Sequence, residues 1–169
     1  RIFGLESDEI MASVADIFYD TVLVRRLEEK IDGPEADILR STDIVVLGDV
    51  LEHMNDPWIV LAEIHRIAKA NSHILISLPT VTSLLSLKRM LSHGFRYKQS
   101  GIFDFTHLRF FSFSTVQELV ELACPSRDVV HHRLICPDSV MLYQTRGNEG
   151  AVSLTDDINL SVTNIFSDW

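Results

Sequence analysis

Cysteine is almost absent from this sequence. Only two of the 169 residues are cysteines, Cys124 and Cys136, and they do not have the spacing of a metal finger. Small secreted domains that depend on disulfides contain far more cysteine. The sequence therefore excludes a cross-linked scaffold and indicates two reduced, partly buried thiols in a cytoplasmic protein.

Long apolar runs and positive charge are also scarce. No apolar run approaches the roughly 18 residues of a membrane span, and the N-terminus has no signal-peptide pattern. Lys and Arg number 15 against 24 Asp and Glu, which gives a net charge of -9. Since binding to phosphate backbones needs clustered cations, a general nucleic-acid binder is excluded, although a local basic patch stays open.

The first quarter of the chain predicts strand, helix and strand. Residues 2–5 form an apolar run, and Asp8 can cap a helix whose apolar residues recur at helical spacing. The expected buried face of that helix consists of Ile10, Met11, Val14, Ala15 and Phe18. Residues 21–24 form a second β-branched run, and residues 25–42 form a polar connection that contains Gly33-Pro34.

The middle of the chain repeats this alternation. Residues 44–47 are typical of a strand buried on both faces of a parallel sheet. Asp56-Pro57 starts a helix predicted to reach Lys69, and residues 73–78 form the next strand. The helix would bury Val60, Leu61, Ile64, Ile67 and Ala68. Such βαβ units predict a doubly wound α/β domain with a mostly parallel sheet and helices on both faces.

The last part of the predicted domain departs from this alternation. A helix over residues 83–93 ends at Gly94, and an aromatic-rich loop over 95–113 is long enough to cover an active site. In the alternative reading its Phe residues are core, and Asp104, His107 and Arg109 form a structural network. A capping box at 114–117 would start another helix, which Pro125 stops.

Two closing strands, 129–135 and 140–145, could pair as a hairpin across Pro137-Asp138. The expected organisation is one domain over residues 1–145, with 80–113 as a substrate-covering insertion and 146–169 as a polar tail.

Three chemically versatile side chains follow the strand at 44–47. Asp49, Glu52 and His53 are spaced i, i+3 and i+4, so a helical turn would place them on one face. Ligands of open α/β sheets bind at the carboxyl ends of strands, where these residues lie. A helix-capping or core role is the alternative for His53.

Four short motifs follow one another between residues 2 and 145. They read Gly4-Leu5-Glu6, Gly48-Asp49-Val50-Leu51-Glu52-His53 with Asp56-Pro57, Ser77-Leu78-Pro79, and Gly101-Ile102-Phe103-Asp104 with Thr106-His107-Leu108-Arg109-Phe110-Phe111. Each is weak alone, but their order and spacing together are specific. The chain thereby resembles class I S-adenosylmethionine-dependent methyltransferases of types 11 and 23, such as the ubiquinone-biosynthesis O-methyltransferases.

The resemblance implies a cofactor site and a Rossmann-like sheet with a C-terminal antiparallel strand. Glu6 would accept hydrogen bonds from the cofactor ribose, with Gly4 beside it. Gly48 and Asp49 would lie near the methionine part of S-adenosylmethionine, where a glycine lets the backbone approach.

The catalytic candidates are His53, as the general base, with His107 and Asp104. Some relatives hold a divalent metal with acids and histidines, which makes Asp49, Glu52, His53 and His107 a candidate metal site. An ordinary hydrogen-bonded cluster is the alternative to a metal.

The sequence also departs from the family pattern. The first strand and its Gly-rich turn are missing, so we expect an N-terminally truncated domain with an exposed sheet edge that favours homo-oligomers. Arg25-Arg26-Leu27-Glu28 stands where an adenine-reading acid is common. Asn71-Ser72 replaces the usual paired glycines, and Thr80 replaces the usual Asn.

The favoured function is methylation of an oxygen on a small molecule, a lipid-linked intermediate or a sugar. Tyr97, Phe103 and Phe105 could offer the acceptor an apolar face, with Arg96, Lys98 and Arg109 for an anionic group. A catalytically inactive scaffold or partner module is the alternative. A dinucleotide or nucleotide-sugar enzyme is disfavoured by the motifs around His53 and His107.

Overall fold

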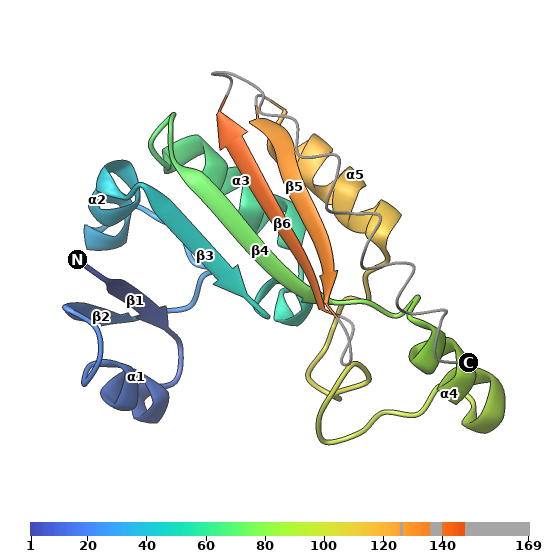
Figure 1. Ribbon diagram of the computed structural model, residues 1–169. Helices are drawn as coiled ribbons and strands as arrows, with labels where there is room; N and C mark the ends of the chain where they lie inside the picture. Colours follow the sequence, from blue (N-terminus) through green and yellow to red (C-terminus); the bar gives the residue numbers. More distant parts are fainter. Residues whose placement is uncertain (126, 136–139, 148–169) are drawn as a thin grey trace.

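The computed structural model describes residues 1–125, 127–135 and 140–147, whose strands form two sheets (Figure 1). The strands are β1 (Phe3–Glu6), β2 (Thr21–Val24), β3 (Ile44–Gly48), β4 (His73–Pro79), β5 (Arg127–Ile135) and β6 (Val140–Gly147). The pair β1-β2 is parallel, and the larger sheet has the order β3-β4-β6-β5. Strands β3 and β4 are parallel, whereas β6 is antiparallel to both neighbours. The predicted α/β class and closing hairpin are confirmed, while Pro137-Asp138 lies outside the described residues.

Most helix boundaries follow local signals in the sequence. The helices are α1 (Glu9–Ala15), α2 (Pro34–Ser41), α3 (Pro57–Ile67), α4 (Leu84–His93) and α5 (Phe113–Ala123), with a 3₁₀ turn η1 (Leu51–His53). Asp8 and Asp56 accept hydrogen bonds from the first backbone amides of α1 and α3. Gly94 ends α4 with a positive φ of 71°. The predicted starts of α1 and α3 and the predicted end of α4 are confirmed.

Two local predictions were wrong. The expected polar connection over 25–42 contains α2, which begins at Pro34 and buries Ala36 completely. Helix α5 begins at Phe113, because Ser112 caps it instead of the predicted Ser114 and exchanges hydrogen bonds with Thr115. A Thr takes the place of the expected Glu or Gln in this box.

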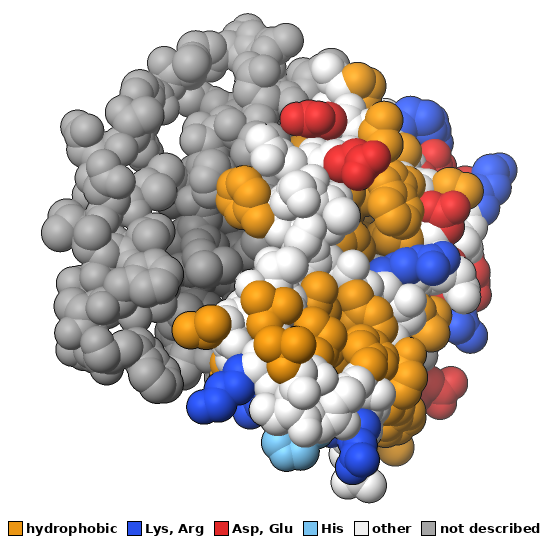
Figure 2. Space-filling model, turned by 90° about the vertical axis from the view of Figure 1, so that its right-hand side faces the viewer, with side chains coloured by type: hydrophobic (Ala, Val, Ile, Leu, Met, Phe, Trp, Pro, Cys, Tyr) orange, Lys and Arg blue, Asp and Glu red, His pale blue; other side chains and the backbone are white. Residues whose placement is uncertain are grey.

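Helix α4 makes little contact with the rest of the described chain. Ser86 is its one buried residue, and all residues from Leu91 to Ser100 are exposed. Exposed hydrophobic side chains with Lys and Arg around them are visible on this side of the molecule (Figure 2). Within the described residues, no helix is long and apolar enough to cross a membrane.

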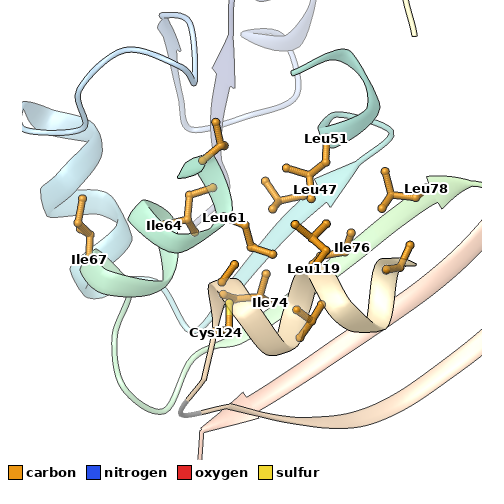
Figure 3. Close-up of a cluster of buried hydrophobic side chains, with 14 of the residues drawn as sticks. Leu47, Leu51, Leu61, Ile64, Ile67, Ile74, Ile76, Leu78, Leu119 and Cys124 are labelled. Atoms are coloured by element: carbon orange, nitrogen blue, oxygen red, sulfur yellow. The ribbon is translucent and has the colours of Figure 1, made fainter. Parts of the chain in front are cut away.

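The core lies between the larger sheet and helices α3 and α5 (Figure 3). Burial alternates along β4, where Ile74, Ile76 and Leu78 are fully buried and the residues between them are half-buried. The predicted inner face of α3 is confirmed, since all five of its residues are buried. Cys124 is a buried thiol of the same core, whereas Cys136 lies outside the described residues.

The sequence predicted that strand β3 is buried on both faces, and this prediction was wrong. Leu47 is buried, but Ile44 is 54% and Val46 is 65% exposed. Among the described residues β3 pairs only with β4, and β1 pairs only with β2. Ile44 and Val46 line the space between β1 and β3.

The predicted buried face of α1 was also wrong. Ala12 is the buried residue of this helix, whereas Ile10 is 71% and Phe18 is 73% exposed. The helical period of these residues was interpreted correctly, but the small β1-β2 sheet offers too little surface to cover them.

Candidate active site

A cavity of about 1040 Å³ lies between β1 and β3. All four residues predicted to bind the cofactor, Gly4, Glu6, Gly48 and Asp49, line it. His53 lines the same cavity. Its volume is at the upper end of the range for small-molecule and cofactor sites, about 300 to 1,000 Å³. The structure therefore brings together, around one space, residues that are more than 40 positions apart in the sequence.

Glu6 keeps one carboxylate oxygen for a ligand. Its Oε1 accepts hydrogen bonds from the backbone amides of Ser7 and Asp8 at 2.7 and 2.9 Å. The other oxygen, Oε2, has no hydrogen bond within the described part of the chain. An ionised carboxylate can only accept hydrogen bonds, so this oxygen suits a hydroxyl donor.

The two glycines of the predicted cofactor site differ. A Cβ at Gly48 would meet nothing within 4 Å, so its backbone borders open space. A Cβ at Gly4 would lie 2.6 Å from Cδ2 of Tyr19. Packing against the Tyr19 ring therefore accounts for Gly4, whereas Gly48 is the position at which a ligand could approach the backbone.

Asp49 adopts a left-handed backbone conformation, with φ of 51°. Its amide donates to the carbonyl of Ser77 at 3.1 Å, and its Oδ1 accepts from the Ser77 hydroxyl at 2.9 Å. These bonds tie the end of β3 to β4. Non-glycine residues with positive φ are uncommon and often mark functional turns. The helical turn that would place Asp49 with Glu52 and His53 on one face therefore does not begin at Asp49.

Glu52 is a buried acid of the turn η1. Its side chain is fully buried, and within the described residues neither carboxylate oxygen has a hydrogen bond. Burial, reinforced by the nearby charge of Asp49, raises its pKa from the ordinary 4.5 to about 7. Such a group is costly to the fold unless a proton or a cation compensates it.

His53 and His107 each direct Nδ1 to a backbone carbonyl. The Nδ1 atoms lie 3.2 Å from the Thr106 carbonyl and 3.0 Å from the Ile102 carbonyl. Because a carbonyl can only accept, each Nδ1 carries a hydrogen, which leaves Nε2 as the nitrogen of each ring that can accept a proton or bind a metal. The rings meet edge to face, with centroids 4.8 Å apart.

One ligand atom from each of Glu52, His53 and His107 lies within 4.8 Å of the others. Asp49 lies outside this cluster, although the sequence suggested it as a fourth ligand. One oxygen and two imidazole nitrogens are a donor set that suits several divalent metals. The two carbonyls that orient the imidazoles resemble the outer hydrogen bonds of metal-bound histidines.

Asp104 supports the cluster without joining it. Its Oδ1 accepts from the amide and hydroxyl of Thr106 at 2.8 and 2.7 Å, and these bonds lower the pKa of Asp104. The turn that they close positions the carbonyl that orients His53. Leu108 and Arg109 then donate their amides to the Glu52 carbonyl at 2.8 and 3.0 Å.

Arg109 and Glu28 both form hydrogen bonds to Asn55, which follows the turn η1. The Arg109 guanidinium donates to the Asn55 carbonyl. Glu28 accepts from the amide and side chain of Asn55 at 2.8 and 2.9 Å. No sequence signal pointed to Asn55 or to the orienting carbonyls, because backbone acceptors have no residue signature.

The aromatic loop has both buried and exposed rings. Phe103 and Phe111 are 4% and 1% exposed and belong to the interior, as the alternative reading of the sequence held. Tyr97 and Phe105 are 59% and 63% exposed. Phe95 makes edge-to-face contacts with Tyr97, Phe103 and Phe110, so the loop is held by its own rings.

Comparisons with known proteins agree with this geometry. Residues 1–76 match the family described as "Methyltransferase domain". No curated protein matches the chain.

Several solved structures share the fold. A possible histamine N-methyltransferase from Thermotoga maritima, described as S-adenosylmethionine-dependent, is 19% identical with a TM-score of 0.62, over 86% of this chain and 72% of that one. Magnesium protoporphyrin IX methyltransferase from Synechocystis, with bound S-adenosylhomocysteine, is 11% identical with a TM-score of 0.61, over 86% and 64%. The N-methyltransferase NodS from Bradyrhizobium japonicum, also with S-adenosylhomocysteine, is 9% identical with a TM-score of 0.57, over 88% and 67%. The expected Rossmann-like fold is confirmed.

Proposed function

We propose that this chain is a class I S-adenosylmethionine-dependent methyltransferase that methylates an oxygen atom of a small molecule, a lipid-linked intermediate or a sugar. The methyltransferase-domain match over residues 1–76 and the shared fold support this proposal. The observation that carries the proposal is the cavity between β1 and β3. Gly4, Glu6, Gly48 and Asp49 line it, and His53 connects it to the cluster with Glu52 and His107.

The cofactor would lie along the ends of β1 and β3. Oε2 of Glu6 would accept a hydrogen bond from a ribose hydroxyl, while Oε1 keeps the turn after β1 in place. The open space at Gly48 would admit the methionine part. Glu6 and Gly48 would thus hold the ribose and the methionine part of one extended ligand.

Methyl transfer is an in-line displacement at the methyl carbon. The acceptor oxygen forms a bond to this carbon as the carbon–sulfur bond breaks, and the sulfur keeps the electron pair in S-adenosylhomocysteine. The acceptor also loses its hydroxyl proton. We assign this proton to Nε2 of His53, since its Nδ1 already donates to Thr106. Alignment of the two reactants supplies most of the acceleration.

The cluster of Glu52, His53 and His107 also fits a divalent cation. A cation would compensate the buried carboxylate of Glu52, whose oxygens otherwise lack partners within the described residues. The two Nε2 atoms would complete the protein ligands. When bound, such a cation would orient an acceptor hydroxyl and lower its pKa. In that case His53 is a metal ligand, and the hydroxyl proton is transferred to a base other than His53.

Calorimetric titration with S-adenosylhomocysteine tests the cofactor site. We would compare the product of the complete gene with its Glu6→Ala and Glu9→Ala variants. Glu9 is an exposed control that does not line the cavity. We expect Glu6→Ala to weaken binding about tenfold or more, since hydrogen bonds to charged groups contribute about 1.5 to 3 kcal/mol. Equal binding by both variants would remove Glu6 from the site.

Titration with Mn²⁺ or Zn²⁺ separates the two roles of His53. Binding that Glu52→Gln abolishes and Glu63→Gln preserves would establish a metal site, because Glu63 pairs with Arg66 on the surface. Without metal binding, we expect His53→Ala to slow methyl transfer by about 10²- to 10⁴-fold, the usual contribution of a general base.

An inactive scaffold is the second candidate function. Arg25, at the place where relatives commonly have an acid, forms ion pairs with Glu29 and with the buried Glu35, at 3.5 and 3.1 Å. This region is therefore organised as a structural network. Absence of S-adenosylhomocysteine binding in every form would favour the scaffold.

A further inference from the structure

We propose that helix α4 and the residues after it, Leu84 to Lys98, form a docking surface for a membrane that contains anionic lipids. This basic segment lies outside the cofactor cavity, and the proposal does not depend on methyl transfer. Charge, exposure and helical geometry each support it.

The charge of the segment is opposite to that of the whole chain. The net charge of the protein is -9, but no Asp or Glu occurs between Glu63 and Asp104. Four cations, Lys88, Arg89, Arg96 and Lys98, lie within the basic segment. Anionic headgroups attract such a group of cations, with about 1 kcal/mol for each Lys or Arg near the surface.

The segment also exposes large apolar side chains. Leu84 is 62%, Leu87 is 41% and Leu91 is 88% exposed. Their spacing of i, i+3 and i+7 puts them in one stripe along α4. At about 100° per residue, this stripe lies roughly 130° around the helix from the buried Ser86, which faces the protein. The leucines therefore point away from the body of the molecule.

The position of α4 leaves this stripe accessible. In Figure 1 the helix lies at the edge of the molecule, away from α3 and α5. Figure 2 shows hydrophobic side chains on this side with Lys and Arg around them. Lys88 lies about 70° around the helix from this stripe, so its charged end can reach headgroups while its methylene stem stays in the apolar layer. Arg89 lies nearly opposite the stripe, and Arg96 and Lys98 follow the helix.

Lipid is favoured over a protein partner by this combination. An interfacial helix has an apolar face, flanking Lys or Arg, and too little length to span the bilayer. Helix α4 has ten residues and contains no acid. A partner protein that received this helix would need acidic groups placed opposite these cations. An anionic bilayer offers negative charge at every position.

Vesicle co-sedimentation of the complete protein tests the proposal. We would compare vesicles of phosphatidylcholine alone with vesicles that also contain phosphatidylglycerol. We expect binding to the anionic vesicles only, weakened by added salt. Arg96→Gln and Lys98→Gln should each lower the partition coefficient roughly fivefold, as expected for one cation near the surface. Arg40→Gln, on α2, serves as the matched control outside the segment.

A Leu87→Ser, Leu91→Ser double variant tests the apolar stripe. We expect it to lose vesicle binding while its circular dichroism and its binding of S-adenosylhomocysteine stay unchanged. Equal binding of all variants, or binding to neutral vesicles alone, would overturn the proposal. Light scattering that shows a dimer abolished by the double variant, without vesicle binding, would instead assign the stripe to a second copy of the chain.

Discussion

The two sheets of this protein differ in how well their apolar residues are covered. Around the larger sheet, Ile74, Ile76 and Leu119 are fully buried in one core with α3 and α5. Around β1 and β2, Ile10 and Phe18 are more than 70% exposed. Both regions have helix caps and clear periodicity, so these local features do not explain the difference. The amount of surface available for packing does.

The cavity lies between these unequal regions. One side is the edge of the well-packed sheet, with Gly48 and Asp49, and the other side is β1 with Glu6. A ligand bound to both sides stabilises the folded state, by a free energy that rises with the logarithm of its free concentration. We therefore expect the cofactor to add more order to β1 and β2 than to the larger sheet.

The largest expected effect tests the difference in packing directly. Leu61→Ala should lower the free energy of unfolding by about 3 to 5 kcal/mol, because it opens a cavity in the core. Ile10→Ala should change it by less than about 0.5 kcal/mol, since this side chain is 71% exposed. Urea denaturation measures both values. Similar losses in the two variants would show that α1 belongs to the same cooperative core.

The next effect concerns the buried acid beside the cavity. Because the pKa of Glu52 is about 7 in the folded state and about 4.5 when unfolded, the folded state binds more protons between these pH values. The free energy of unfolding should therefore fall by about 3 kcal/mol as the pH rises from 4.5 to above 7. Denaturation in metal-free buffer should show that Glu52→Gln removes this part of the pH dependence. An unchanged profile in that variant would mean that Glu52 does not titrate in this range.

The smallest effect compares the two aspartate caps. Asp56→Ala should lower the free energy of global unfolding by about 1 kcal/mol, because α3 belongs to the core. Asp8→Ala should mainly speed hydrogen exchange within α1, whose opening exposes little further surface. An equal shift of the urea denaturation midpoint in both variants would show that α1 and α3 unfold as one unit.

Local features were predictable because few residues decide them. The caps at Asp8 and Asp56 and the stop at Gly94 depend on residues within one helical turn. Helix α2 was missed because its sequence is polar and short, and its burial follows from the position of Ile31 and Ala36 against the core. Burial is a property of what lies around a segment.

The candidate site shows the same division. The motifs identified Glu6, His53 and His107 by residue type and spacing. They could not show that the Thr106 carbonyl orients His53, a contact across 53 positions. Nor could they show that Asp49 turns away into a left-handed conformation tied to Ser77.

The sequence by itself predicted most of the alternation of strands and helices, the starts of α1 and α3 and the end of α4. Hydrophobic period and capping act over a few residues, so they can be inferred from the order of amino acids. Only the tertiary structure decided that Glu52 is buried without a hydrogen-bond partner among the described residues, and that Ile10 and Leu91 are exposed. Desolvation and exposure depend on contacts between distant segments, which the local pattern does not contain.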